Sequence, residues 1–93
     1  MLSILENLEP RFEEKGSYLF DGHEVREVIF IQQGKVDVGY MYNDKEKYVL
    51  RYQDATVLGA YNCTYNRDTE YIYRCPAKSS GFFIPKVNWN EIM

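Results

Sequence analysis

Residues 28–40, VIFIQQGKVDVGY, carry the clearest indication of the fold. Residues 28–31 are continuously apolar, with β-branched and aromatic side chains, which is typical of a strand buried on both faces. Residues 32–35, QQGK, predict a tight turn. Residues 36–40 place Asp37 and Gly39 between valine and tyrosine neighbours, and this alternation predicts a half-buried strand. The stretch therefore reads as an antiparallel hairpin.

Short β-prone runs separated by glycines continue on both sides of this hairpin. Between residues 15 and 84, glycines interrupt short runs rich in Val, Ile, Tyr and Phe, which predicts an all-β middle part. A second hairpin is expected, with the charged residues 43–47 (NDKEK) as its solvated tip and residues 48–52 (YVLRY) as its returning strand.

Both ends of the chain carry patterns that start helices. Near the beginning, Ser3 and Glu6 have the spacing of a capping box, and Pro10 is expected to close this short helix. Near the end, Asn88 is expected to cap a second helix, with Glu91 at its third position and residues 87 and 92 as a hydrophobic staple. This helix would have barely one turn before Met93, so we expect a fragment of a longer protein.

Composition narrows the class of protein. A chain of 93 residues makes one domain, and a hydrophobic share of 45% is that of a folded chain. No apolar run approaches the roughly 18–20 residues that span a bilayer, so no direct membrane insertion is expected. The net charge is −3 and the basic residues are scattered, which argues against a nucleic acid partner. Cys63 and Cys75 are too few and too far apart for a disulfide framework, which favours a reducing cytoplasm.

The order of a helix, a glycine-punctuated β region and a second helix resembles the cyclic nucleotide-binding domain family. Three stretches carry this resemblance: GSYLFDG at residues 16–22, VIFIQQGKVDVGY at 28–40 and FFIPKVNWNEIM at 82–93. The resemblance covers roughly residues 5–93 and implies a mainly β fold. That fold is a β-roll of the double-stranded β-helix or jelly-roll type with short flanking α-helices. It also implies that residues 1–93 form one such domain without its C-terminal lid helix.

In this family the ligand sits in a phosphate-binding cassette, in which a Gly-Glu pair opens a short helix and an arginine follows. Backbone amides and a guanidinium suit a cyclic phosphate, and the glutamate accepts the ribose 2′-hydroxyl. Here Gly59 matches the glycine, Ala60 stands at the glutamate position, and Arg67 falls about two residues early for the arginine. The ligand-binding residues that the resemblance implies are Gly59, Ala60, Tyr61, Asn62, Arg67, Asp68 and Thr69.

Other residues weaken this cassette. Asp68 and Glu70 stand beside Arg67, where they compete for its guanidinium and repel a phosphate. Arg74 is a second candidate for the phosphate contact. Four tyrosines are expected to fill the space that a purine would use, namely Tyr61, Tyr65, Tyr71 and Tyr73. The cassette is therefore interpreted as degenerate.

The resemblance implies a cytoplasmic regulatory domain of an ion channel, with weak or lost binding of cAMP or cGMP. Its partners would then be the rest of a membrane channel and neighbouring subunits. The alternative is a structural or interaction module with a self-filled β-roll and no sensing role. An enzyme is not expected, because His23 is the only histidine and neither Cys63 nor the serines at 79 and 80 have a base partner. Neither a metal nor another cofactor is expected, since no residues have the spacing of a zinc site.

Overall fold

The structure is a computed structural model that describes residues 4–20 and 23–92. In chain order its elements are α1 (Ile4–Asn7), β1 (Glu9–Glu13), β2 (Tyr18–Leu19), β3 (Glu27–Gln33), β4 (Lys35–Tyr42), β5 (Lys45–Gln53), β6 (Thr56–Leu58), α2 (Ala60–Thr64), β7 (Ile72–Arg74), β8 (Ser79–Pro85) and α3 (Lys86–Ile92). The fold is mainly β with short helices, as the sequence predicts. No helix among the described residues is long and apolar enough to cross a membrane.

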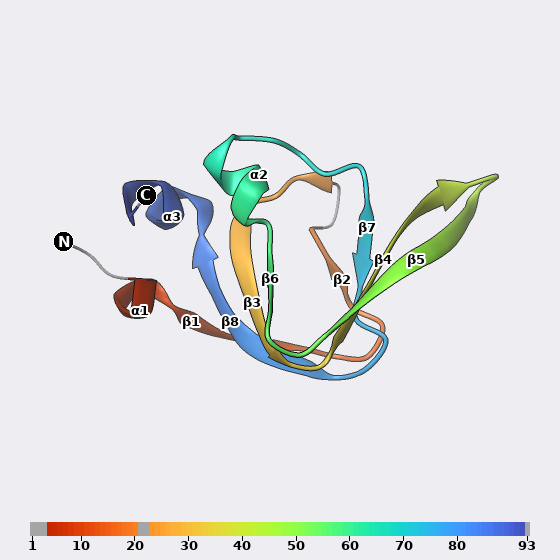
Figure 1. Cartoon of the computed structure of the whole chain (residues 1–93), viewed down its shortest axis with the longest axis horizontal. Helices are drawn as coiled ribbons and strands as arrows, with labels where there is room; N and C mark the ends of the chain where they lie inside the picture. The colour runs from red at the N-terminus through yellow and green to blue at the C-terminus, as the bar shows by residue number, and fades with distance from the viewer. Residues whose placement is uncertain (1–3, 21–22, 93) are drawn as a thin grey trace.

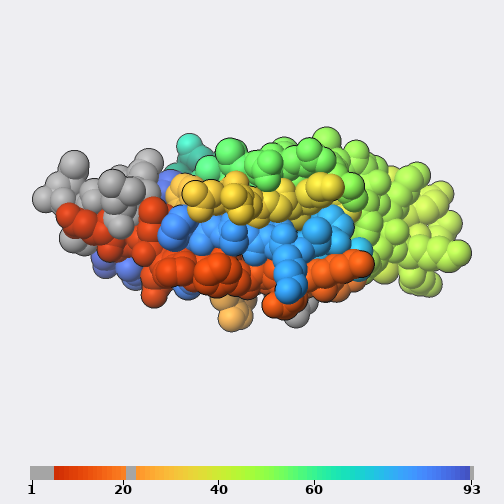
Figure 2. Space-filling model, turned by 90° about the horizontal axis from the view of Figure 1, so that it is seen from below, coloured from red at the N-terminus to blue at the C-terminus, as the bar shows by residue number. Residues whose placement is uncertain are grey.

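The strands form two four-stranded antiparallel sheets, in the orders β1-β8-β3-β6 and β2-β7-β4-β5. The hairpin of β4 and β5 projects from the rest of the roll, and α2 lies at the end of β3 and β6 (Figure 1). In the view from below, β1, β8, β3 and β6 lie side by side across the molecule (Figure 2). The chain thus crosses repeatedly between the two sheets, and α2 lies on the connection from β6 in the first sheet to β7 in the second.

Strand β3 lies in the middle of the first sheet and supplies much of the core. Val28 and Ile29 point to opposite faces because side chains alternate along a strand, and both are fully buried. Helices α2 and α3 both contact this strand. Ile31 is also buried and Phe30 partly so. The prediction of a strand buried on both faces is confirmed, and so is the turn between β3 and β4 around Gly34.

The prediction that β4 is half-buried is wrong for two positions, Asp37 and Gly39, which are both buried. The Asp37 carboxylate accepts hydrogen bonds from Arg51 Nε at 2.6 Å and Nη2 at 3.0 Å, and this contact with the paired strand β5 lowers the pKa of Asp37. At Gly39, where a bulge interrupts the register, the carbonyl oxygen of Lys47 passes 2.1 Å from where a Cβ would lie. Residues of the paired strand β5 therefore cover the second face of β4. The alternation of residue types within β4 does not reveal these partners.

The second hairpin has a shorter tip and longer strands than expected. Its turn consists of Asn43 and Asp44 alone, both with positive φ (51° and 62°), which is the two-residue geometry that matches strand twist. The charged residues 45–47, predicted as part of the tip, belong to β5 instead and pair with residues 40–42.

The expectation for the first helix is only partly right. Helix α1 ends at Asn7, and Pro10 lies inside β1 rather than closing the helix. This strand is at the edge of its sheet, where a residue without an N–H group is tolerated. The β part of the chain therefore begins at Glu9 and not at residue 15. The predicted cap, Ser3, lies outside the described residues.

The last helix begins earlier than its predicted cap. Helix α3 starts at Lys86, directly after Pro85 ends β8, and the Lys86 N–H donates to the carbonyl oxygen of Arg26 at 2.8 Å. Asn88 is therefore inside the helix, where its side-chain amide donates to Asn7 Oδ1 at 3.1 Å. Val87, the expected staple, is exposed.

Three of the glycines that interrupt the apolar runs lie at bends of the roll. Gly16, Gly34 and Gly59 all have positive φ, at 90°, 130° and 85°. Gly22, at the end of the stretch 16–22 that carries the family resemblance, lies outside the described residues.

Candidate functional site

A hollow of about 450 Å³ lies beside α2, and strands from both sheets line it. Its lining residues are Val38, Val49, Leu50, Tyr52, Val57, Leu58, Gly59, Ala60, Tyr61, Asn62, Tyr71 and Tyr73. Aliphatic side chains from β4, β5 and β6 form an apolar wall, and α2 and four tyrosines complete the lining. Such a volume and lining are typical of a small-molecule site that holds an apolar group.

Four of the predicted site residues, at positions 59–62, line this hollow. Gly59 precedes α2 in a left-handed conformation (φ 85°), and a Cβ there would lie 2.8 Å from the carbonyl oxygen of Glu27. Glycine is required here because the backbone turns sharply while packed closely against the start of β3. Ala60 then begins α2, and its methyl packs against the core. The position where the family has a carboxylate thus presents an apolar surface.

Arg67 lies in the loop after α2 and is exposed. Its N–H donates to the carbonyl oxygen of Asn62 at 2.8 Å, and the Asn62 side chain in turn donates to the carbonyl oxygen of Asp68 at 3.1 Å. These bonds fold the loop back onto α2. The structure does not bring Arg67 to the wall of the hollow beside α2 or of the hollow next to it.

A neighbouring hollow of about 320 Å³ is lined by Tyr61, Asn62, Asp68, Thr69, Glu70, Tyr71 and Tyr73. Thr69 is buried within this wall. Its N–H donates to the carbonyl oxygen of His23 at 2.9 Å, and its hydroxyl accepts a hydrogen bond from the Tyr71 N–H at 3.1 Å. Thr69 therefore fastens the loop to the turn around His23, and Asp68 and Glu70 supply the formal charges on this hollow's wall.

The tyrosines form walls and do not fill the hollow. Tyr61, Tyr65 and Tyr71 are 65%, 63% and 52% exposed, so the prediction that they occupy the space of a purine is wrong for these three. The rings of Tyr61 and Tyr65 lie against each other at 4.8 Å on the surface of α2. Tyr73 is partly buried, with its ring edge-on to Phe20 at 5.2 Å. Exposed aromatic rings at the rim leave the hollow open.

Arg74, the second candidate for a phosphate contact, serves another role. It lies on β7 directly opposite Asp37 of β4, and its charge joins that of Arg51 in lowering the Asp37 pKa. Arg74 lines neither of the two hollows beside α2.

The sequence patterns did not point to the apolar wall of the larger hollow. The pattern at residues 48–52 predicts only a strand for Val49 and Leu50, and in the structure Val49, Leu50 and Val57 are all more than half exposed. One signal in the sequence indicates this wall. Val49 and Leu50 are adjacent apolar residues on a hairpin that otherwise carries many charges.

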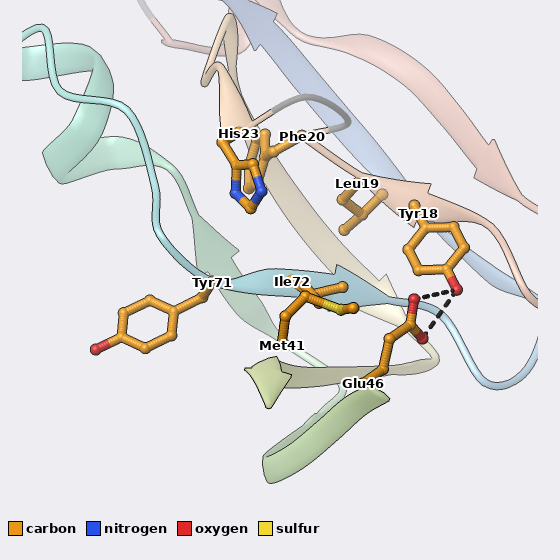
Figure 3. A pocket seen from close by; sticks show the side chains of 8 residues that line it. All are labelled: Tyr18, Leu19, Phe20, His23, Met41, Glu46, Tyr71 and Ile72. Atoms are coloured by element: carbon orange, nitrogen blue, oxygen red, sulfur yellow. Dashed lines mark hydrogen bonds between the residues drawn. The ribbon is translucent and has the colours of Figure 1, made fainter. Parts of the chain in front are cut away.

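A third hollow, of about 370 Å³, lies between β2, the start of β7 and the β4–β5 hairpin (Figure 3). Its carboxylate, Glu46, is already engaged by the protein, because the Tyr18 hydroxyl lies within 3.0 Å of both carboxylate oxygens. The Tyr48 hydroxyl donates to the same group at 2.7 Å, and these bonds lower the pKa of Glu46. Glu46 thus links β2 to β5.

No catalytic arrangement is visible among the described residues. Cys63 and Cys75 are buried and unpaired, and burial raises the pKa of both thiols, so they are protonated at neutral pH. Within residues 4–20 and 23–92, no group of three or more His, Cys, Asp or Glu side chains could hold a metal ion.

Comparison with known proteins identifies the fold. No protein-family model and no curated protein matches the sequence. Among solved structures, the chain is similar to the regulatory domain of Toxoplasma gondii PKA with cAMP (TM-score 0.85, 12% identity). It is also similar to the regulatory subunit of a cAMP-independent protein kinase A from Trypanosoma cruzi bound to guanosine (TM-score 0.82, 15% identity). A third similar structure is the EAL enzyme Bd1971 in its cGMP-bound form (TM-score 0.78, 14% identity).

These matches cover 97%, 96% and 89% of this chain but only 35%, 33% and 23% of the three proteins. The chain thus spans about a third or less of their length. At this identity the comparisons establish the fold, which is the cyclic nucleotide-binding β-roll with short helices.

Proposed function

We propose that this chain is a regulatory domain of the cyclic nucleotide-binding type whose pocket binds cAMP or cGMP weakly. One observation carries the proposal. An open hollow lies beside the Gly59 turn and α2, yet Ala60 supplies no carboxylate and Arg67 does not line the hollow. The hollow has room for a ligand, but it lacks the carboxylate and the guanidinium that would hold a cyclic nucleotide.

The expected loss of binding affinity follows from the free energy of these two missing contacts. A hydrogen bond to a charged group contributes about 1.5–3 kcal/mol, so each missing contact weakens binding by roughly tenfold to a hundredfold. The apolar wall of β5 and β6 still offers burial to a purine ring. Weak binding that depends mostly on the base is the expected result.

Titration of the isotope-labelled chain with cAMP and cGMP tests this proposal. Amide resonances of residues 59–62 and 68–73 are expected to shift, with half-saturation near millimolar ligand. Residues 43–47, which form the turn of the second hairpin and the start of β5, serve as an internal control, because they line neither hollow beside α2. No shift around residues 59–73 at millimolar ligand would end the sensor hypothesis.

Restoring the carboxylate gives a second prediction. Ala60→Glu is expected to tighten cAMP binding by about tenfold, because the new side chain can accept the ribose 2′-hydroxyl. The matched control is Asn90→Glu, which adds the same charge at an exposed position of α3. Isothermal titration calorimetry of both variants measures the difference. Equal affinities in the two variants would mean that the ribose does not reach α2.

The setting that we propose for this domain is the cytoplasmic side of an ion channel, with the remainder of the channel and neighbouring subunits as partners. The support is the resemblance of the hairpin at residues 27–40 to regulatory domains of channels. Copurification of the full-length parent protein with membranes tests this setting, and a parent found only in the soluble fraction would contradict it.

A structural or interaction module is the second candidate function. The observation in its favour is the row of exposed apolar residues on β5, β6 and α2, which includes Val49, Leu50, Val57 and Tyr61. The two functions separate in the titration described above, because a module of this kind would show no nucleotide-dependent shifts.

A further inference from the structure

The two hollows beside α2 adjoin each other. Tyr61, Asn62, Tyr71 and Tyr73 line both of them, so a ligand in one can extend into the other. Aliphatic side chains line only the larger hollow, and the carboxylates of Asp68 and Glu70 line only the smaller one. Together they suit a ligand that has a flat apolar part and a polar part attached to it.

The charges around the smaller hollow are of one sign. Asp68 and Glu70 line it, and neither carboxylate has a salt-bridge partner among the described residues. Arg67, the neighbouring cation, does not line it. A phosphate placed here would face two like charges without a compensating cation, so an anionic ligand is disfavoured.

Hydrogen bonding leads to the same conclusion. Ionised carboxylates only accept hydrogen bonds, and phosphate oxygens also only accept them, so neither can satisfy the other. The hydroxyl groups of a free sugar are donors and complement Asp68 and Glu70. The ring of Tyr71 or Tyr73, which border both hollows, gives an aromatic base a surface to stack on.

From these charges and donors we propose that the pocket selects an uncharged nucleoside over a cyclic nucleotide. The base lies against the aliphatic wall, and the sugar hydroxyls donate to the carboxylates of Asp68 and Glu70. This inference rests on the proposed function, since it assigns the ligand class of the same pocket.

Parallel NMR titrations of the whole chain with adenosine, guanosine, cAMP and cGMP test the inference. Each nucleoside is expected to bind about tenfold more tightly than its cyclic phosphate, with shifts at residues 59–62 and 68–73. Raising the salt concentration should narrow this gap, because only the cyclic nucleotides are repelled by charge. Cyclic nucleotides that bind as tightly as nucleosides would overturn the inference and leave the proposed function standing. No shift with any of the four compounds would overturn both.

The source of the selectivity is tested by a double variant, Asp68→Asn with Glu70→Gln. Both positions are exposed, so the fold is expected to persist. Removing the two charges should reduce the preference for nucleosides to about threefold or less. Glu9→Gln with Glu14→Gln is the matched control, since it removes the same charge at exposed positions outside both hollows. An unchanged preference in the first double variant would show that these carboxylates do not select the ligand.

Discussion

Replacing Trp89 with alanine is expected to lower the free energy of unfolding by about 3–5 kcal/mol. The indole of Trp89 is 7% exposed and belongs to the main core cluster. Its Nε1–H donates to Thr64 Oγ1 at 2.9 Å, which joins α3 to the last residue of α2. The substitution would remove the largest side chain of the core and the hydrogen bond between the two helices together. A loss of this size is a large share of the roughly 5–15 kcal/mol that stabilises a typical domain.

Urea denaturation measures the effect, followed by circular dichroism because the variant lacks the protein's single tryptophan. Thr64→Val is the control, since it removes the acceptor and keeps the indole in place. It is expected to cost only about 1 kcal/mol. A loss below about 1 kcal/mol for Trp89→Ala would contradict the packing of α3 against α2 and β3.

The contact at Trp89 also bears on the pocket. Residues 60–62 at the start of α2 line the larger hollow, and Thr64 at its end accepts the bond from Trp89. A five-residue helix has too few internal hydrogen bonds to be stable alone, so its position depends on tertiary contacts. Weakening the link at Trp89 should therefore reduce ligand affinity as well as stability.

The parts of the fold that the sequence predicted well are those governed by local rules. The apolar run at residues 28–31 and the turn at Gly34 depend on alternation and on backbone freedom, which each residue carries with it. The burial of Asp37 could not be predicted in this way, because it depends on Arg51 of another strand. The start of β1 was missed for a related reason, since Pro10 reads as the end of a helix until its edge position is known.

The candidate site was predictable to a similar extent. The turn at Gly59 is predictable because it depends on a single glycine before a helix, and the structure confirms it. The position of Arg67 depends on how a loop folds back onto Asn62, and counting residues does not reveal that. The apolar wall formed by Val49 and Leu50 arises only when β5 pairs with β4 and faces α2.

Gly81→Ala is expected to destabilise the roll by about 3 kcal/mol, at the upper end of what overpacking costs. Gly81 is buried in the middle of β8, between β1 and β3. A Cβ there would lie 1.9 Å from the carbonyl oxygen of Phe30, a backbone atom that moves only if β3 moves. Close approach of the two strands, and not an unusual backbone angle, thus requires glycine at this position. The midpoint of thermal unfolding should fall by roughly 4–8 °C for each kcal/mol lost.

Gly16→Ala separates this effect from the general cost of replacing a glycine. Gly16 has a φ of +90°, but a Cβ there would meet nothing closer than the Arg74 guanidinium at 3.7 Å. Backbone strain alone should then cost about 1–2 kcal/mol. If thermal unfolding shows equal losses for the two variants, the strands β3 and β8 are not as close as the structure has them. If Gly81→Ala costs clearly more, the tight contact in the middle of the first sheet is what fixes the spacing of the strands that support α2 and its pocket.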